Sequence, residues 1–141
     1  MNEEIVKKVH LLRVTDVATK LNNICQTIHR HFNKKEAILI LVPSQEAAVY
    51  IDQLLWRQPN DSFLPHAVAN LPTQELVAIT TTGTNVNQAV AILNLCPEIP
   101  VNLKEYSIIY DLLDLTHPAK EQLSLNRQLA YQMLGYVLVS H

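Results

Sequence analysis

Glycine is scarce in this chain: Gly83 and Gly135 are the only glycines among 141 residues. Loops that cradle phosphate use closely spaced glycines, because a residue without a side chain lets backbone N–H groups approach the anion. Neither GxGxxG nor GxxxxGK[ST] can be written on this sequence. The common phosphate-binding loops are therefore excluded, although a looser nucleotide contact stays open.

Cysteine and long apolar runs are scarce as well. Two cysteines, Cys25 and Cys96, are too few for a disulfide framework. The longest apolar stretches, such as AILILVP, are far shorter than the roughly 20 residues of a membrane-spanning helix. The first residues, MNEEIVKKVHLL, lack the long apolar core of a secretion signal. We therefore expect a cytoplasmic protein without a membrane segment.

A marked excess of positive or negative charge is also missing. Eleven basic and thirteen acidic residues leave a net charge of -2, and no Lys/Arg run exceeds a pair. Without a positive field we expect no tight, direct binding to nucleic acid. Apolar residues make up 48% of the chain, a value ordinary for globular proteins. The length suits one domain, so we expect residues 1–141 to form it.

Residues for metal or covalent chemistry do not form a recognisable pattern. Cys25 and His29 stand four apart on an expected helix, but Cys25 lies in its apolar stripe and His31 should project elsewhere. The nucleophile motif GxSxG is absent, and the six histidines are scattered. We assign no catalytic, metal-binding or cofactor-binding residue.

Hydrophobic periodicity predicts alternating strands and helices. An amphipathic helix should follow a first strand, and the continuous apolar run AILILV is typical of a strand buried on both faces of a parallel sheet. We expect an α/β fold, a three-layer α/β/α domain with a largely parallel sheet and a nucleotide-binding-like topology without a phosphate loop. Its last helix should begin at Pro118, end before Gly135 and turn Leu123, Ala130 and Met133 inward. The expected strands cover residues 9–14, 37–42, 76–81 and 106–113, with a further apolar run at 89–95.

One segment, LLWRQPNDSFLPH over residues 54–66, holds the only tryptophan and one of two phenylalanines beside two prolines. Two interpretations are open. The aromatic side chains could pack as a small cluster beneath a loop. The alternative is a partner-binding patch, because Trp, Phe and Pro make rigid anchors in protein interfaces.

This segment resembles the chi subunit of bacterial DNA polymerase III, whose members share the pattern WxxPxxSFxPH after a leucine. The order of strands and helices also agrees, so that the resemblance spans residues 9–136. The matching residues are Leu55, Trp56, Pro59, Ser62, Phe63, Pro65 and His66.

The resemblance implies a non-catalytic accessory subunit of the clamp-loader part of the replicase. It would link the loader, through the small psi subunit, to the single-stranded-DNA-binding protein, and some chi-like proteins pair instead with a DinG-type helicase. The residues that the resemblance assigns to psi or the helicase are Trp56, Phe63, Leu64, Pro65 and His66.

A second family site, on the last helix, takes the acidic, aromatic-ending tail of the single-stranded-DNA-binding protein. An arginine can fork onto a terminal carboxylate there while an aromatic ring fills an apolar pocket. The matching candidates are Lys120, Arg127 and Tyr131, although this helix has fewer cations than the family pattern. The alternative is that Arg127 and Tyr131 only form an exposed helix face.

Two other functions remain open at this point. One is a stand-alone small-ligand or nucleotide-binding enzyme on a Rossmann-like fold, because a fold alone does not determine function. The other is a chi-like protein that has lost its replicase role.

Overall fold

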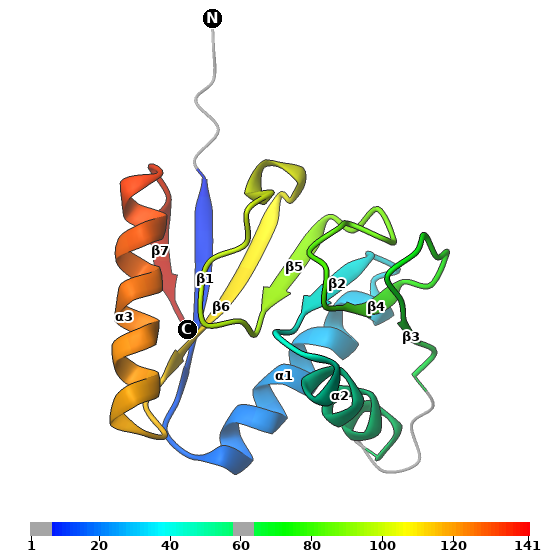
Figure 1. Cartoon of the computed structure of the whole chain (residues 1–141), viewed down its shortest axis with the longest axis horizontal. Helices are drawn as coiled ribbons and strands as arrows, with labels where there is room; N and C mark the ends of the chain where they lie inside the picture. Colours follow the sequence, from blue (N-terminus) through cyan, green and yellow to red (C-terminus); the bar gives the residue numbers. More distant parts are fainter. Residues whose placement is uncertain (1–6, 58–63) are drawn as a thin grey trace, which may run out of the picture.

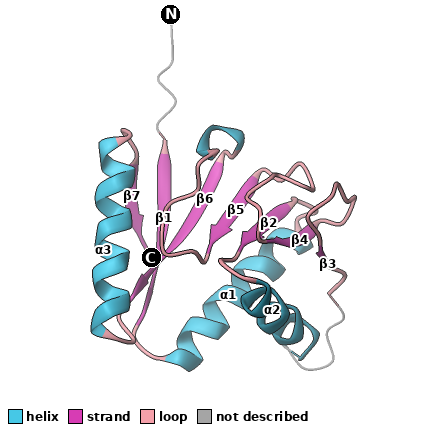
Figure 2. Ribbon diagram, viewed as in Figure 1, coloured by secondary structure: helices cyan, strands magenta, loops and turns pink. Residues whose placement is uncertain are grey.

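The computed structural model describes residues 7–57 and 64–141. Its seven strands form one sheet in the order β3-β4-β2-β5-β6-β1-β7 (Figures 1 and 2). Every neighbouring pair is parallel, so the three-layer α/β/α fold is confirmed and the sheet is wholly rather than largely parallel. The strands are β1 (Lys8–Val14), β2 (Ile38–Leu41), β3 (Ala67–Val68), β4 (Val77–Thr80), β5 (Ala91–Asn94), β6 (Ile108–Asp114) and β7 (Val137–Ser140). The helices are α1 (Val17–Asn33), α2 (Gln45–Arg57), α3 (Pro118–Met133) and the short 3-10 helix η1 (Leu103–Glu105).

The two faces of the sheet carry separate hydrophobic cores. Helices α1 and α2 cover one face, where Ile38 and Ile40 of β2 point toward them. Helix α3 and the loops after β4 and β5 cover the other face, which receives Leu39 and Leu41 of the same strand. Because β2, β4 and β5 are buried on both faces, they read in the sequence as continuous apolar runs rather than alternating ones.

Local chemistry determines where the helices begin and end. The Asp16 carboxylate accepts a 2.8 Å hydrogen bond from the Thr19 N–H and caps α1. Pro118, which lacks an N–H, occupies the first turn of α3, as its position in the sequence indicated. Gly135 has a φ of 89°, a left-handed conformation that ends α3 and turns the chain into β7.

The inward face of α3 differs from the sequence expectation. Leu123 and Met133 are exposed, and Ala130 is only partly buried. The helix instead turns Ser124, Arg127 and Tyr131 toward the sheet. The expectation was wrong because it assumed an apolar contact, whereas this side of α3 is held by hydrogen bonds to the buried carboxylate of Asp111 on β6.

His31 also departs from the expectation that it projects away from the packed face of α1. It is buried, and its Nε2 lies 2.7 Å from the hydroxyl of Tyr110 on β6. The helix therefore carries a polar contact within its otherwise apolar inner face.

The connections leave the centre of the sheet in opposite directions. From β2 the chain passes through α2 to β4 on one side, while from β5 it passes to β6 on the other. Adjacent parallel strands whose connections diverge in this way leave a crevice at their carboxyl ends, which is where open α/β sheets bind ligands.

Candidate functional site

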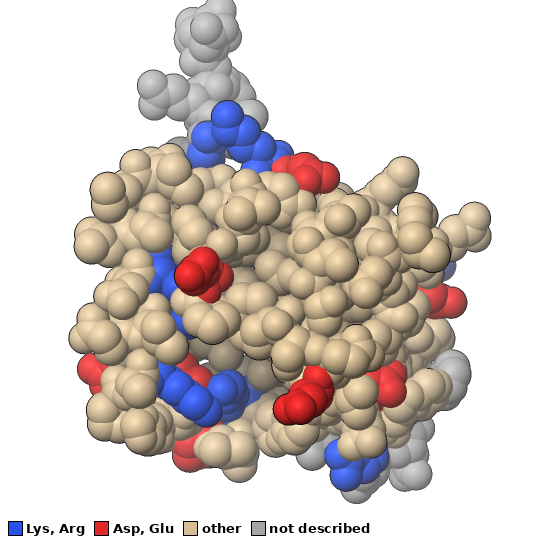
Figure 3. Space-filling model, in the orientation of Figure 1, with Lys and Arg blue, Asp and Glu red and all other residues tan. Residues whose placement is uncertain are grey.

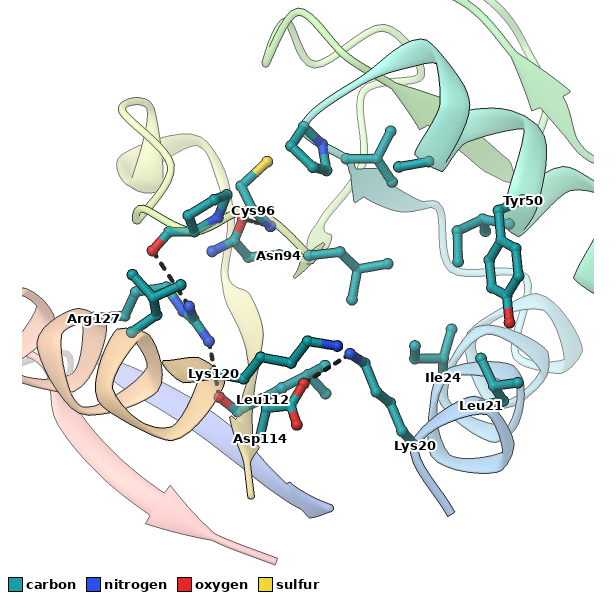
Figure 4. A pocket seen from close by; sticks show the side chains of 17 residues that line it. Lys20, Leu21, Ile24, Tyr50, Asn94, Cys96, Leu112, Asp114, Lys120 and Arg127 are labelled. Carbon is teal, nitrogen blue, oxygen red and sulfur yellow. Dashed lines mark hydrogen bonds and ion pairs between the residues drawn. The ribbon is translucent and has the colours of Figure 1, made fainter. Parts of the chain in front are cut away.

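A pocket of about 400 Å³ lies at this crevice. Its walls come from α1 and α2 on one side, from α3 on the other, and from the carboxyl ends of β2, β5 and β6 between them (Figure 4). Most of the lining is apolar, so the pocket suits an aliphatic or aromatic group of a ligand. The apolar side chains that line it include Leu21, Ile24, Ile51, Leu95, Leu112 and Leu123.

Two lysines reach into the pocket from opposite walls, Lys20 from α1 and Lys120 from α3 (Figure 4). The ammonium group of Lys20 lies 2.7 Å from the carboxylate of Asp114 at the end of β6. The ammonium group of Lys120 forms no hydrogen bond or ion pair with any residue that the structure describes. Lys120 is therefore the cation of the pocket that is most available to a ligand.

Asp114 is held in its ionised form. Burial acts to raise the pKa of this carboxyl, but hydrogen bonds from Lys20 and Thr116 outweigh it, and the pKa is lowered overall. The ion pair consequently persists at neutral pH. The positive charge that Lys20 adds to the pocket is therefore partly neutralised by Asp114.

The electrostatics of the pocket favour an anion. Of the three cations that line it, Lys20 is paired with Asp114 and Arg127 with the buried Asp111, so the charge of Lys120 is left unbalanced among the described residues. The amino-terminal ends of α2 and α3 open on the same edge, and a helix amino terminus carries about half a positive charge. In the surface view, blue side chains flank the hollow beside α3, with red side chains next to them (Figure 3).

Arg127 forms the wall of the pocket rather than a free guanidinium. Only 9% of the residue is exposed, and its Nε donates to the Asp111 carboxylate at 3.0 Å. Its Nη2 donates to the Leu112 carbonyl and the Ser124 hydroxyl, both at 3.1 Å, and its Nη1 donates to the Pro97 carbonyl at 3.3 Å. A guanidinium has five N–H groups, so one N–H is left after these four hydrogen bonds.

Asp111 is the centre of this buried network. Its carboxylate accepts hydrogen bonds from Arg127, from the Tyr131 hydroxyl at 2.6 Å and from the Asn94 amide at 3.1 Å. Burial raises the pKa of Asp111, and the charge of Arg127 opposes that rise. Burial and the neighbouring Asp111 also raise the pKa of Tyr131, so its hydroxyl remains a donor.

Of the residues predicted to take the tail of the single-stranded-DNA-binding protein, Lys120 and Arg127 line the pocket. Tyr131 lies behind it with no exposed surface, packed between α3 and the sheet. Sequence reasoning missed Lys20 and Tyr50, which line the pocket from α1 and α2. No sequence feature near Lys20 or Tyr50 identifies them as pocket residues, because their role depends on where their helices lie relative to α3.

The structure brings two of the five residues of the first predicted site together. The ring of Trp56, in the last turn of α2, lies 4.8 Å from the ring of His66, and Trp56 is 51% exposed. His66 is oriented by the carboxylate of Asp52 at 2.7 Å and by the Leu64 carbonyl at 2.8 Å. The His66 side chain is itself buried, so it backs the exposed Trp56 ring rather than facing solvent. We call Trp56, with His66 behind it, the aromatic surface.

The remaining residues of that site differ in their environment. Leu64 is completely buried in the core shared by α1 and α2, so it supports the aromatic surface from beneath. Pro65 is partly buried. Phe63 lies outside the described residues, as do Pro59 and Ser62.

Cys96 is the most reactive residue type that lines the pocket. Burial and the neighbouring Asp111 raise the pKa of its thiol to about 11, so it is protonated and weakly nucleophilic at neutral pH.

Within residues 7–57 and 64–141, no three His, Cys, Asp or Glu side chains gather as metal ligands. None of the helices there is long and apolar enough to cross a membrane.

Comparison with known proteins places this architecture in a family. A family model described as DNA polymerase III chi subunit, HolC, matches residues 7–138. No curated protein matches the chain. Because the match covers nearly all of the sequence, the chain belongs to the DNA polymerase III chi subunit family, whose members are accessory, non-catalytic subunits of that polymerase.

Proposed function

We propose that this protein is a non-catalytic, cytoplasmic subunit that tethers the clamp loader, through psi, to the single-stranded-DNA-binding protein during replication. The observation that carries the proposal is the presence of two unlike surfaces, a cationic pocket and an exposed aromatic surface, in a member of the chi family. A tether needs two sites that can be occupied at once. We take residues 1–141 as one domain that carries both.

The pocket suits the acidic tail of the single-stranded-DNA-binding protein. Lys120 and, more weakly, Lys20 supply positive charge at its mouth, and the amino-terminal ends of α2 and α3 add to it. Leu123 and its apolar neighbours can receive the terminal aromatic ring. Arg127 shapes the wall and offers its remaining N–H to a carboxylate oxygen.

The aromatic surface suits psi or a DinG-type helicase. A half-exposed Trp supported from behind by a buried His is the kind of rigid anchor that contributes most to protein interfaces. Asp52 holds the buried His66 in place, and the His66 ring packs beside Trp56, so little side-chain entropy of Trp56 is lost when a partner binds. Leu64 keeps the chain under this surface packed, and Phe63 and Pro65 remain candidates for direct contact.

Helix α2 separates the two sites. Tyr50, in the middle of the helix, lines the pocket, and Trp56 lies six residues further on, in the last turn. One rigid helix can then hold both partners. This raises the local concentration of the polymerase machinery at template DNA that is covered by the single-stranded-DNA-binding protein, without any chemical step.

Titration calorimetry with a peptide of the acidic tail tests the pocket. We expect saturable binding in the micromolar range, as for one small peptide in one pocket. Lys120→Ala should weaken binding about tenfold, whereas Lys104→Ala, which removes an exposed lysine far from this pocket, should not. A peptide without its terminal aromatic residue should also bind poorly. Binding that is unchanged by Lys120→Ala would contradict the assignment of the pocket.

The position of the pocket at the divergence of β2 and β5 favours a second candidate, a small-ligand or nucleotide-binding enzyme. The protonated Cys96 thiol and the missing glycine loop weigh against it. Calorimetric titration with ATP separates the candidates. Saturable nucleotide binding that Lys120→Ala abolishes would favour the enzyme over the tether.

A further inference from the structure

Both ring nitrogens of His66 lie at hydrogen-bond distance from an acceptor. The Nδ1 atom lies 2.8 Å from the Leu64 carbonyl oxygen, and the Nε2 atom lies 2.7 Å from a carboxylate oxygen of Asp52. A carbonyl oxygen and a carboxylate oxygen can only accept a hydrogen bond. Since the His66 side chain is 0% exposed, water does not take the place of either acceptor.

A neutral imidazole cannot satisfy this arrangement. It carries one N–H group, so its second nitrogen would turn a lone pair toward an acceptor at 2.7 or 2.8 Å. The imidazolium carries two N–H groups and donates to both acceptors. Taking its charge out of water is costly, and the two hydrogen bonds, one of them to a carboxylate, offset that cost. The contacts of His66 are therefore those of the doubly protonated ring.

Asp52 is the only charged side chain with a described contact to His66. Helix α2 carries two other charged residues: Glu46 lies exposed in its first turn, and the Nε of Arg57 donates to the Gln53 carbonyl. Strands β3 and β4, with the sequences AV and VAIT, contain no titratable side chain. Helix α1 directs three charged residues toward β6, which is not adjacent to β3 or β4: Lys20, Arg30 and His31.

The His66 ring lies against the indole of Trp56. The ring centres are 4.8 Å apart, and the ring planes are inclined by 54°. A cation within about 6 Å of the centre of an indole ring is attracted to that ring. Asp52 and Trp56 stand four residues apart on α2, so adjacent turns of one helix face hold both partners of His66. The charged ring thus links the carboxylate to the half-exposed indole.

We propose that His66 is held as an imidazolium and that this charged ring positions Trp56 for partner capture, so that the aromatic surface depends on pH. Asp52 is a positioning residue, because it acts on Trp56 through His66. When the ring loses one proton, one acceptor loses its hydrogen bond and the attraction between the ring and the indole falls. Capture should therefore weaken as the pH rises. This last step rests on the proposed function of the aromatic surface.

Fluorescence tests the link between His66 and Trp56 directly, because Trp56 is the only tryptophan of the chain. Followed from about pH 5 to about pH 9, its emission should show a transition as the neighbouring ring loses its charge. Nitrogen NMR of the His66 ring, assigned among the six histidines with the variant His66→Gln, should give the same midpoint. The transition should be absent in His66→Gln, and circular dichroism verifies that the variant is folded.

The variant Asp52→Asn tests the carboxylate. It keeps the size of the side chain but removes its charge, so the midpoint of the fluorescence transition should fall by about one pH unit. Glu46→Gln is the matched control, because it removes the same charge from an exposed position of the same helix. Its midpoint should equal that of the parent.

Affinity capture of psi or the helicase, below and above the fluorescence midpoint, measures the consequence. We expect the parent to capture its partner several-fold less well above the midpoint. His66→Gln should capture weakly at both pH values. Tail binding at the pocket, whose lining does not include His66, is measured on the same samples and should not follow this midpoint.

A fluorescence signal that does not follow the titration of His66 would overturn the proposal, and so would a midpoint that Asp52→Asn leaves in place. Equal capture on both sides of the midpoint would overturn the positioning role. If the parent captures neither partner at any pH, the proposed function of the aromatic surface fails, while fluorescence and NMR still decide whether the charge of His66 acts on Trp56.

Discussion

At the scale of single residues, Arg127 shows how a candidate contact residue can be a structural one. Its guanidinium satisfies a buried carboxylate and three other acceptors, and the pocket wall depends on that arrangement. Loss of tail binding in an Arg127 variant would therefore not distinguish a lost contact from a collapsed wall. Lys120 is the better probe of binding, because it has no internal partner among the described residues.

Replacing Arg127 with alanine should lower the free energy of unfolding by about 3 kcal/mol, because it leaves the Asp111 carboxylate buried without its charge partner. Urea denaturation measures this change. Lys120→Ala on the same helix is the control and should stay within about 0.5 kcal/mol of the parent. A small loss for Arg127→Ala would mean that Asp111 becomes protonated or hydrated at little cost.

Histidine burial predicts a pH dependence of stability. Burial lowers the pKa of His31 below its usual 6.5, and burial and the neighbouring His141 lower the pKa of His10. The unfolded chain then binds these protons first as the pH falls. This contribution is complete above pH 6.5 and is lost as the pH falls through the lowered values.

Urea denaturation at pH values of about 7.5 and about 5 should thus show lower stability in acid. His31→Gln should shrink the difference between the two pH values, whatever its effect on stability itself. If the difference is unchanged in His31→Gln, the buried His31 is not a source of the acid sensitivity.

At the scale of elements, α2 and the chain that follows it carry one residue that supports the aromatic surface and one that we expect to contact the partner. Leu64 is fully buried in the core, whereas Trp56 is half exposed. Leu64→Ala should cost about 2 to 5 kcal/mol of unfolding free energy, because it opens a cavity. Trp56→Ala should cost less than about 1 kcal/mol.

Affinity capture of psi or the helicase provides the second half of this comparison. We expect Trp56→Ala to lose capture while its melting temperature stays near that of the parent. The matched control is Tyr50→Ala, a similarly exposed aromatic of the same helix on the other site. Equal loss of capture in both variants would argue against two separate surfaces.

The elements differ in how far they could be predicted. The run ILIL of β2 has no polar residue, so burial on both faces was evident before the structure. Helix α3 was located correctly by Pro118 and Gly135, but its orientation was not. Its apolar residues at 125, 129 and 133 point outward, and its polar residues at 124, 127 and 131 point inward.

At the scale of the whole molecule, a net charge of -2 coexists with a local excess of positive charge at the pocket. Binding of an acidic tail should therefore weaken as salt rises, because exposed charges are screened beyond about 10 Å at 0.1 M salt. Calorimetry at increasing sodium chloride measures this. Capture at the aromatic surface, which is mainly apolar, should respond much less, and an equal salt response at both sites would contradict the division of roles.

Much of the protein followed from its sequence alone: the order of strands and helices, the α/β class, the missing phosphate loop and the resemblance to the chi family. Periodicity, glycine spacing and the WxxPxxSFxPH pattern are local properties, so they can be read along one chain. The tertiary structure decided which residues meet. Lys20 reaches Asp114 across 94 positions, and Arg127 turns inward because Asp111 lies beneath it, since such contacts depend on how distant elements pack.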